Sequence, residues 1–326
     1  MYTNTISNRK KIIISILIIF LIGIIIWGIS LLSEKKVYNV YNEIESDYHE
    51  IIYNDQKYTY NTSVISILFM GIDTRDSKKQ GQADSIQILL LNRKNQSIQV
   101  ISLSRDIMTE IKLFDAAYNE LGWHKQHLGL AYSYGDSKAS GCMLMTQAIS
   151  KMLNGIPIVN YVSMDLNTLP NVHSIVGDLE VVMPNDSLEV VNERWKEGET
   201  ITITNENIEE YIRTRDINEE FSNNYRMERQ KAYGIEYFKK IKDMLEDNFD
   251  ETIKQIYNSC NDMTTNISLN DIKSFGEMIL TYSFDYNNEY YILKGEDISG
   301  EIHDEFEVDQ DYLNKLIIKL FYSREE

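Results

Sequence analysis

Arginines gather in one part of a sequence that otherwise holds few of them. Arg213 and Arg215 stand two residues apart, and Arg226 and Gln230 follow at a spacing of four, which places the last two on one face of a helix. A planar guanidinium group can donate two parallel hydrogen bonds to two oxygens of one phosphate. The dipole at a helix N-terminus also favours a phosphate anion. The cluster therefore predicts a pyrophosphate-binding site, with surface ion pairs to the 50 acidic residues as the alternative.

Two aspartates and one further arginine belong to the same prediction because of the elements that must position them. Three segments read as strands: residues 64–72, 85–91 and 97–104. In an antiparallel meander, the end of the first strand, the start of the second and the end of the third share one sheet edge. Asp73, Asp84 and Arg105 then converge. Two carboxylates at this edge predict a site for a hard divalent cation that bridges the phosphates.

The remaining patterns mix helices with strands. We expect helices at residues 141–153, 205–213, 224–247, from 269 onward and at 310–322, a strand pair around 161–164 and 179–182, and a strand at 290–293. No repeat or low-complexity tract marks a second boundary. The patterns indicate one layered α/β or α+β domain over residues 63–326.

The N-terminal part has a different character. Residues 12–32 form an uncharged run rich in Ile and Leu, long enough for one transmembrane helix. Residues 1–11 carry Arg9, Lys10 and Lys11, so the positive-inside rule favours a cytoplasmic N-terminus and an extracellular remainder at the cell membrane. Apolar residues at helical spacing then predict a helical stalk over residues 33–62.

Charge and cysteine content narrow the function classes. The formal net charge of -18 argues against a nucleic-acid partner, because binding to phosphate backbones needs a basic surface. Cys142 and Cys260 are isolated in sequence and have no metal-ligand spacing. We expect both to be buried free thiols, with a disulfide as the alternative.

Five ordered motifs carry a resemblance to a known family. They are Gly71-Ile72-Asp73-Thr74-Arg75, Gln82-Ala83-Asp84-Ser85, Ser102-Leu103-Ser104-Arg105-Asp106, Tyr211-Ile212-Arg213-Thr214-Arg215 and Arg226-Met227-Glu228-Arg229-Gln230. In these motifs the sequence resembles the LytR-CpsA-Psr family of cell-envelope phosphotransferases, over about residues 65–238. The resemblance implies an α/β fold, with a mixed central sheet flanked by helices and a hydrophobic pocket for a polyprenyl chain. It also implies transfer of a glycopolymer, such as teichoic acid or capsule, from a polyprenyl-pyrophosphate carrier to the muramic acid 6-hydroxyl of peptidoglycan.

The resemblance assigns roles by position. It implies Asp73 and Asp84 as catalytic residues and Mg²⁺ ligands. Pyrophosphate binding falls to Arg75, Arg105, Arg213, Arg215, Arg226 and Gln230, of which Arg105, Arg213 and Arg215 are also expected to be catalytic. The wall of the lipid pocket is expected on the apolar helix that holds Met143, Met145, Ile149 and Met152. Ordinary core packing is the alternative for these four.

Four positions depart from the family pattern. Gln82 replaces an arginine, Ser104 a proline, Gly129 an asparagine, and Asn223 an aspartate. Gln82 and Asn223 keep open a second function, that of a non-catalytic or regulatory envelope protein that binds polyprenyl phosphates. Hydrolysis of the lipid pyrophosphate, with water in place of the sugar hydroxyl, is a related alternative.

Overall fold

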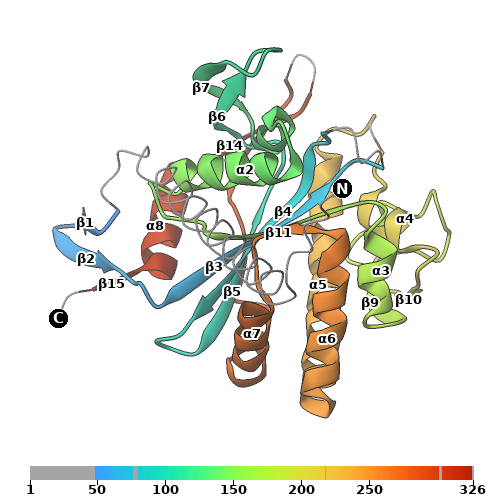
Figure 1. Cartoon of the computed structure of the whole chain (residues 1–326). Coiled ribbons are helices and arrows are strands. Elements are labelled where there is room, and N and C mark those ends of the chain that lie inside the picture. Colours follow the sequence, from blue (N-terminus) through green and yellow to red (C-terminus); the bar gives the residue numbers. More distant parts are fainter. Residues whose placement is uncertain (1–47, 76–79, 217, 301–302, 325–326) are drawn as a thin grey trace, which may run out of the picture. The chain divides into compact units, whose positions relative to one another are not determined.

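A mixed six-stranded sheet forms the centre of the domain (Figure 1). The structure is a computed structural model that describes residues 48–75, 80–216, 218–300 and 303–324. In spatial order the strands are β11 (Thr264–Thr265), β8 (Asn160–Asp165), β3 (Val64–Ile72), β4 (Ala83–Asn92), β5 (Ser97–Leu103) and β12 (Tyr290–Ile292). The α/β fold with a mixed, helix-flanked sheet is confirmed.

The middle of this sheet is the meander expected from the sequence. β3 pairs antiparallel with β4, and β4 pairs antiparallel with β5. β8 and β12 extend the sheet by parallel pairing with β3 and β5, and β11 closes one side antiparallel to β8. The end of β3, the start of β4 and the ends of β5 and β8 therefore lie at one edge, as predicted for Asp73, Asp84 and Arg105.

One face of the sheet is covered by α2 (Lys138–Met152) and α8 (Gln310–Phe321) (Figure 1). Alternation along β3 points Leu68 and Met70 into this layer, where they pack in one core with side chains of both helices. The short helix η1 (Leu128–Tyr134) joins the same core.

The opposite face is covered by α5 (Ser222–Asp247), α6 (Phe249–Ser259) and α7 (Leu269–Thr281) (Figure 1). The turn η2 (Cys260–Asp262) follows α6. Ile67 and Phe69 of β3 point to this side and pack with α7 and the residues around it. Sequence reasoning missed α6, and it placed α2, α5 and α8 within three residues of their bounds.

A smaller layer packs beside α5. It consists of α3 (Leu169–Ser174), the antiparallel pair β9 (Leu179–Val182) and β10 (Thr200–Ile203), and α4 (Ile208–Arg213). The two strands expected to pair at 161–164 and 179–182 exist, but they belong to different sheets. β8 pairs with β3 and β11 in the central sheet, whereas β9 pairs with β10.

Three peripheral pairings complete the described chain. β6 (Met108–Phe114) pairs with β7 (Glu120–His127), and β13 (Gly295–Ile298) pairs with β14 (Glu305–Val308). β1 (Glu50–Tyr53), β2 (Gln56–Tyr60) and β15 (Tyr322–Arg324) form a three-stranded sheet in this order.

The three-stranded sheet corrects the predicted stalk. Residues 50–60 form a β-hairpin, not the end of a helix, because its inner strand pairs with the last strand of the domain and Tyr60 packs edge-on against Tyr322. The domain therefore includes this hairpin and does not begin at residue 63. The predicted stalk up to residue 47 lies outside the described residues.

The predicted transmembrane segment at residues 12–32 also lies outside the described residues. Within the described ranges, no helix combines the length and the apolar composition needed to span a bilayer. Cys142 and Cys260 are free thiols, as expected, but of the two only Cys142 is buried, whereas Cys260 is partly exposed.

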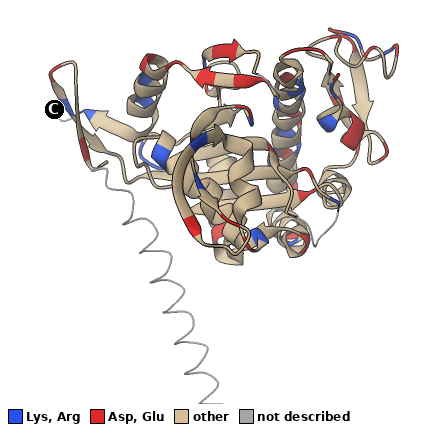
Figure 2. Ribbon diagram, turned by 90° about the horizontal axis from the view of Figure 1, so that it is seen from above, with Lys and Arg blue, Asp and Glu red and all other residues tan. Residues whose placement is uncertain are grey.

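Charged residues are concentrated outside the central sheet (Figure 2). In its six strands, the charged side chains are Asp84 near the start of β4 and Asp165 at the end of β8. Both lie at the edge where β3 ends, beside the pairing of Ile72 with Asp165. Burial of unpaired charge in a sheet is unfavourable, so two carboxylates at one edge indicate that partners for their charge lie nearby.

Candidate active site

A cavity of about 440 Å³ opens on the face of the sheet covered by α5, α6 and α7. Its walls are mostly apolar, with Phe69 and Leu89 from the sheet and Ile256 and Phe275 from α6 and α7. At one end the lining changes to charged and polar groups. These are Asp73, Asp84, Asp165, Arg213, Arg226 and Gln230. The cavity thus suits a ligand with an apolar body and an anionic end.

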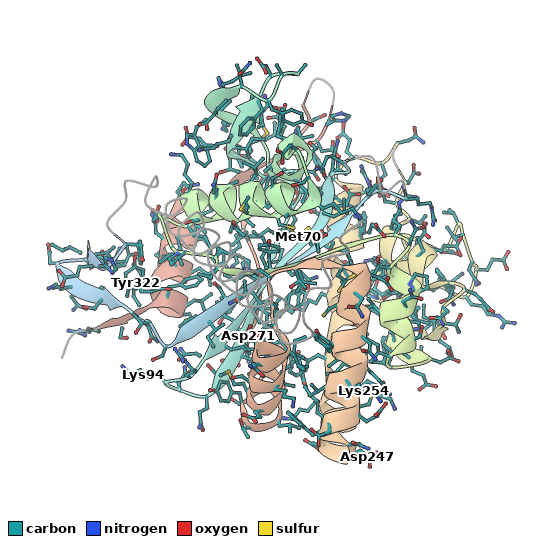
Figure 3. The ribbon with its side chains drawn as sticks, in the orientation of Figure 1. Met70, Lys94, Asp247, Lys254, Asp271 and Tyr322 are labelled. Atoms are coloured by element: carbon teal, nitrogen blue, oxygen red, sulfur yellow. The ribbon has the colours of Figure 1, made fainter. Side chains whose placement is uncertain are left out.

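Helix α5 connects the two ends of the cavity. Arg226, Gln230, Gly234, Phe238 and Ile241 all line it, and their spacing of three or four residues keeps them on one helix face. At 1.5 Å per residue this stripe extends roughly 22 Å from the cation to the apolar end. Figure 3 labels Asp247 at the end of α5 that lies away from Met70 and the charged edge of the sheet.

Asp84 lies at the centre of the more buried half of the cavity's charged end, which is called the inner half below. Its Oδ1 is bound by Arg105 Nη1 and its Oδ2 accepts from Arg226 Nη1 at 2.9 Å. Arg226 Nη2 also donates to the Asp84 carbonyl oxygen at 3.2 Å. Two guanidinium groups from different elements are therefore held together by one carboxylate, and Arg226 faces the cavity.

Arg226 is kept in an unfavourable environment for a cation. Its side chain is 3% exposed. Burial lowers the pKa of Arg226, the carboxylate of Asp84 raises it, and the nearby charges of Arg105 and Arg215 lower it further. A buried guanidinium beside two other cations would gain from an anionic ligand.

The outer half of the charged end is the more exposed one, and Asp73 lies at its centre, at the rim of the cavity. Asp73 Oδ1 accepts from Arg213 Nη2 at 2.8 Å and from Nε at 3.1 Å. Arg213 is about half exposed and Asp73 about a third. Both line the cavity, so this pair is accessible to a ligand and to solvent.

Three predicted arginines lie beyond the lining. Arg75 is exposed and binds both carboxylate oxygens of Glu209, which also lies 4.0 Å from Arg213. Arg215 donates from Nη1 to Ser222 Oγ at 3.2 Å. Arg105 likewise reaches the cavity only through Asp84. The lining itself contains Asp73, Asp84, Arg213, Arg226 and Gln230 from the predicted set.

Gln230 and Arg229 are adjacent in sequence but make different contacts. Gln230 Oε1 accepts from Ser85 Oγ at 3.0 Å, and its Nε2 donates to the Ile212 carbonyl at 3.3 Å. Arg229 is fully buried, and its Nε donates to the Tyr211 carbonyl at 3.0 Å, with further bonds to Ser187 Oγ and the Thr214 carbonyl. Arg229 therefore fixes α5 to the end of α4, which positions Arg213.

Asp165 is a cavity-lining carboxylate that sequence reasoning missed. Its Oδ2 pairs with Lys138 Nζ at 3.1 Å, and its Oδ1 accepts from the Thr168 hydroxyl. Burial alone would raise the pKa of Asp165, but Lys138 and the hydrogen bonds lower it below its usual value. A single charged residue at the end of an otherwise uncharged strand was the available signal.

Among the residues that the structure describes, no group of three or more His, Cys, Asp or Glu side chains is placed to hold a metal ion. Asp73 and Asp84 nevertheless supply two carboxylates that line one cavity end. Mg²⁺ in phosphate sites is commonly held by one or two carboxylates together with the phosphates and water. The donor set fits magnesium when a phosphate ligand shares it.

The structure accounts for two departures from the family pattern. Gln82 Oε1 accepts from Arg105 Nη2 at 3.0 Å, so a neutral acceptor stands where a second guanidinium would repel Arg105. Gly129 approaches the sheet so closely that a Cβ atom would lie 2.7 Å from the Ala83 carbonyl oxygen. An asparagine has no room there without a backbone shift.

The four residues expected to form the lipid wall lie outside this cavity. Met145 and Ile149 of α2 are buried in the core on the other face of the sheet, and Met152 packs against that core. Neither they nor Met143 line the cavity. Its apolar wall comes instead from β3, β4, α5, α6 and α7.

Residues 30–317 match the LytR_cpsA_psr family. The chain belongs to this family. Among curated relatives, the polyisoprenyl-teichoic acid–peptidoglycan teichoic acid transferase TagU of Bacillus cereus is 29% identical over 192 residues, which are 56% of this chain and 55% of that protein. The transferase TagV of Bacillus subtilis is 26% identical over 184 residues, 54% of this chain and 44% of that protein. The chain thus matches about half the length of these LytR_cpsA_psr relatives.

Solved structures share the fold. The crystal structure of B. subtilis TagV superposes with a TM-score of 0.62 at 22% identity, over 79% of this chain and 96% of that chain. A structure of TagT bound to LI-WTA gives a TM-score of 0.59 at 22% identity, over 79% of this chain and 90% of that chain. The mixed sheet with its helical layers is therefore also the fold of these two structures.

Proposed function

We propose that the protein transfers a glycopolymer, with the phosphate attached to its first sugar, from a polyprenyl-pyrophosphate carrier to the muramic acid 6-hydroxyl of peptidoglycan. The observation that carries the proposal is the cavity, whose apolar wall ends on Arg226, Arg213 and Gln230. A polyprenyl chain matches the apolar part and its pyrophosphate matches the charged end. The names of TagU and TagV, which are teichoic acid transferases, support the choice of polymer and acceptor.

The reaction is a phosphoryl transfer, for which positioning and charge neutralisation supply most of the catalysis. The acceptor oxygen forms a bond to the phosphorus that bears the sugar, and the bond from that phosphorus to the bridging oxygen breaks. The lipid phosphate leaves, and the hydroxyl proton passes to solvent. Arg226 and Arg105 lie with Asp84 at the inner end, where they would stabilise charge on the leaving phosphate.

The rim pair has a complementary role in the proposal. Arg213 is the cation most open to solvent among those that line the cavity, so it would bind the phosphate that receives the acceptor hydroxyl. Asp73 and Asp84 would hold Mg²⁺, which would add positive charge against the pyrophosphate. Asp165 keeps Lys138 at the same edge.

The proposed setting is the outer face of a cell membrane. The apolar run at residues 12–32 and the basic residues before it support a single-pass anchor with a cytoplasmic N-terminus. A periplasm- or surface-active reporter enzyme fused after residue 326 should be active outside the cell. A reporter that is active only in the cytoplasm would overturn this orientation.

The function is tested with the full-length protein, a lipid-linked polymer precursor, Mg²⁺ and peptidoglycan oligomers. We expect a phosphodiester product by mass spectrometry, and a loss of kcat by roughly 10²–10³-fold in Arg213→Ala, as for removal of one charge-stabilising donor. Arg194→Ala is the matched control because Arg194 is exposed and does not line the cavity. Equal rates for Arg213→Ala and wild type would refute the mechanism. Free sugar phosphate would identify a hydrolase, and binding without turnover a lipid-binding protein.

A further inference from the structure

Asn223 lies in the first turn of α5, one turn before Arg226, and is 3% exposed. Its Oδ1 accepts from Arg226 Nη2 at 2.8 Å and from Arg226 Nε at 3.2 Å. Its Nδ2 donates to Asp106 Oδ2 at 2.8 Å and to Ser104 Oγ at 2.9 Å. One amide therefore joins the buried guanidinium of α5 to the turn that follows β5.

The amide group is chemically required for this arrangement. It presents an acceptor to a cation and donors to a carboxylate at the same time, which an ionised carboxylate cannot do because it only accepts. An aspartate in place of Asn223 would bring a second negative oxygen against Asp106 Oδ2. An apolar residue would leave the donors of Arg226 and the acceptor of Asp106 without these partners in a buried place.

The neutral side chain also sets the charge of the inner site. Arg105 and Arg226 are balanced by Asp84 and Asp106, since Arg105 pairs with both aspartates and Arg226 pairs with Asp84. A third carboxylate would make this group net negative where an anionic ligand must enter. Ser104, the other departure in this turn, supplies a hydroxyl acceptor to the same amide that a proline could not.

The orientation of Arg226 follows from these contacts. Asn223 holds the guanidinium through Nε and Nη2, and Asp84 holds it through Nη1 and Nη2. The plane of the group is thus fixed from both sides while the residue lines the cavity. We infer that Asn223 is a positioning residue that presents Arg226 to the pyrophosphate of the ligand, with Ser104 and Asp106 as its anchor. This inference rests on the proposed function.

A charge-conserving swap tests the inference. In Asn223→Asp, the new carboxylate and the carboxylate of Asp106 face each other as two acceptors. In Asp106→Asn, the new amide and the amide of Asn223 face each other as two donors. In the double variant, the amide now at position 106 can donate to the carboxylate now at position 223 and still accept from Arg105, so the hydrogen bonds are restored with the two groups exchanged. The charge count is that of the wild type. Asn224→Asp is the matched control, because Asn224 is the next residue and its Nδ2 binds Asp297 Oδ2 at the surface.

The binding of inorganic pyrophosphate with Mg²⁺ is measured by calorimetry on the full-length protein, together with kcat and KM for transfer and the melting temperature. We expect each single variant at the inner site to weaken pyrophosphate binding about 10- to 100-fold, and the double variant to recover most of the loss. Asn224→Asp should change it less than about threefold.

Three results would decide against the inference. Wild-type affinity in Asn223→Asp would show that Asn223 does not position Arg226. The loss of binding free energy in the double variant could also equal the sum of the losses in the two single variants. That result would show that the amide does not act through Asp106. If the wild type bound no pyrophosphate, the proposed function would fall together with the inference, whereas the first two results leave the function intact.

Discussion

Gly234 offers a way to fill the proposed lipid pocket without disturbing the charged end. It lies four residues after Gln230 on the stripe of α5 that lines the cavity, roughly 6 Å further from the cations. A Cβ atom on Gly234 would meet no atom within 4 Å. A side chain there therefore extends into open cavity and not into packed core. Gly234→Leu should fold well and exclude part of the lipid.

The expected magnitudes follow from this geometry. Leucine adds four carbon atoms, and if they displace an equal number from the lipid at ~0.8 kcal/mol each, affinity falls by about 3 kcal/mol, or roughly 200-fold. The same change should raise the free energy of unfolding by about 1 kcal/mol, because glycine is unfavourable inside a helix. Gly234→Ala is the control. It has the same gain in stability but displaces only about one carbon, an effect of about fourfold.

The assay is equilibrium binding of a fluorescent polyprenyl phosphate in detergent, paired with calorimetry of inorganic pyrophosphate. Gly234→Leu should lose lipid affinity and keep pyrophosphate affinity, since the charged end is a full helical turn away. Unchanged lipid binding in a variant with a raised melting temperature would refute the assignment of this cavity to the lipid chain.

Two further predictions concern stability. Arg229→Met should lower the free energy of unfolding by about 3 kcal/mol in urea titrations, because the buried Arg229 satisfies the carbonyls of Tyr211 and Thr214; a loss below about 0.5 kcal/mol would contradict its structural role. Burial lowers the pKa of His173 below 6.5, so the unfolded chain takes up the proton first as pH falls, and stability should decline from about pH 6.5 downward. His173→Gln should flatten this part of the profile, and an identical slope in both proteins would show that another group is responsible.

The part of the site that could be predicted is the part set by strand order and by local motifs. A meander of three apolar strands brings its ends to one edge, so Asp73 and Asp84 were expected to share it, and both line the cavity. Helical spacing of four likewise placed Arg226 and Gln230 on one face. Spacing alone does not distinguish Arg226 from Arg229, because which of them faces the ligand depends on how α5 is rotated against its neighbours. That rotation is fixed by contacts far away in sequence, such as Arg229 with Tyr211.

The helix expected to form the lipid wall, α2, lies outside the cavity for a physical reason. A helix that covers a fully packed face of a sheet needs apolar residues on most of its surface, and α2 has nine buried residues of fifteen, including Cys142, Met145 and Ile149. A helix that lines a cavity packs less densely there and can carry a glycine such as Gly234, whose missing side chain leaves the space open. The buried residues of α2 therefore pack against protein side chains. The helices best suited to hold a lipid are amphipathic ones with a narrower apolar stripe, as in α5 and α6, and this pattern is indistinguishable in sequence from that of any surface helix. Under the proposed function, a cation at the start of such a stripe is what distinguishes a lipid-phosphate wall from an ordinary one, and in α5 this cation is Arg226.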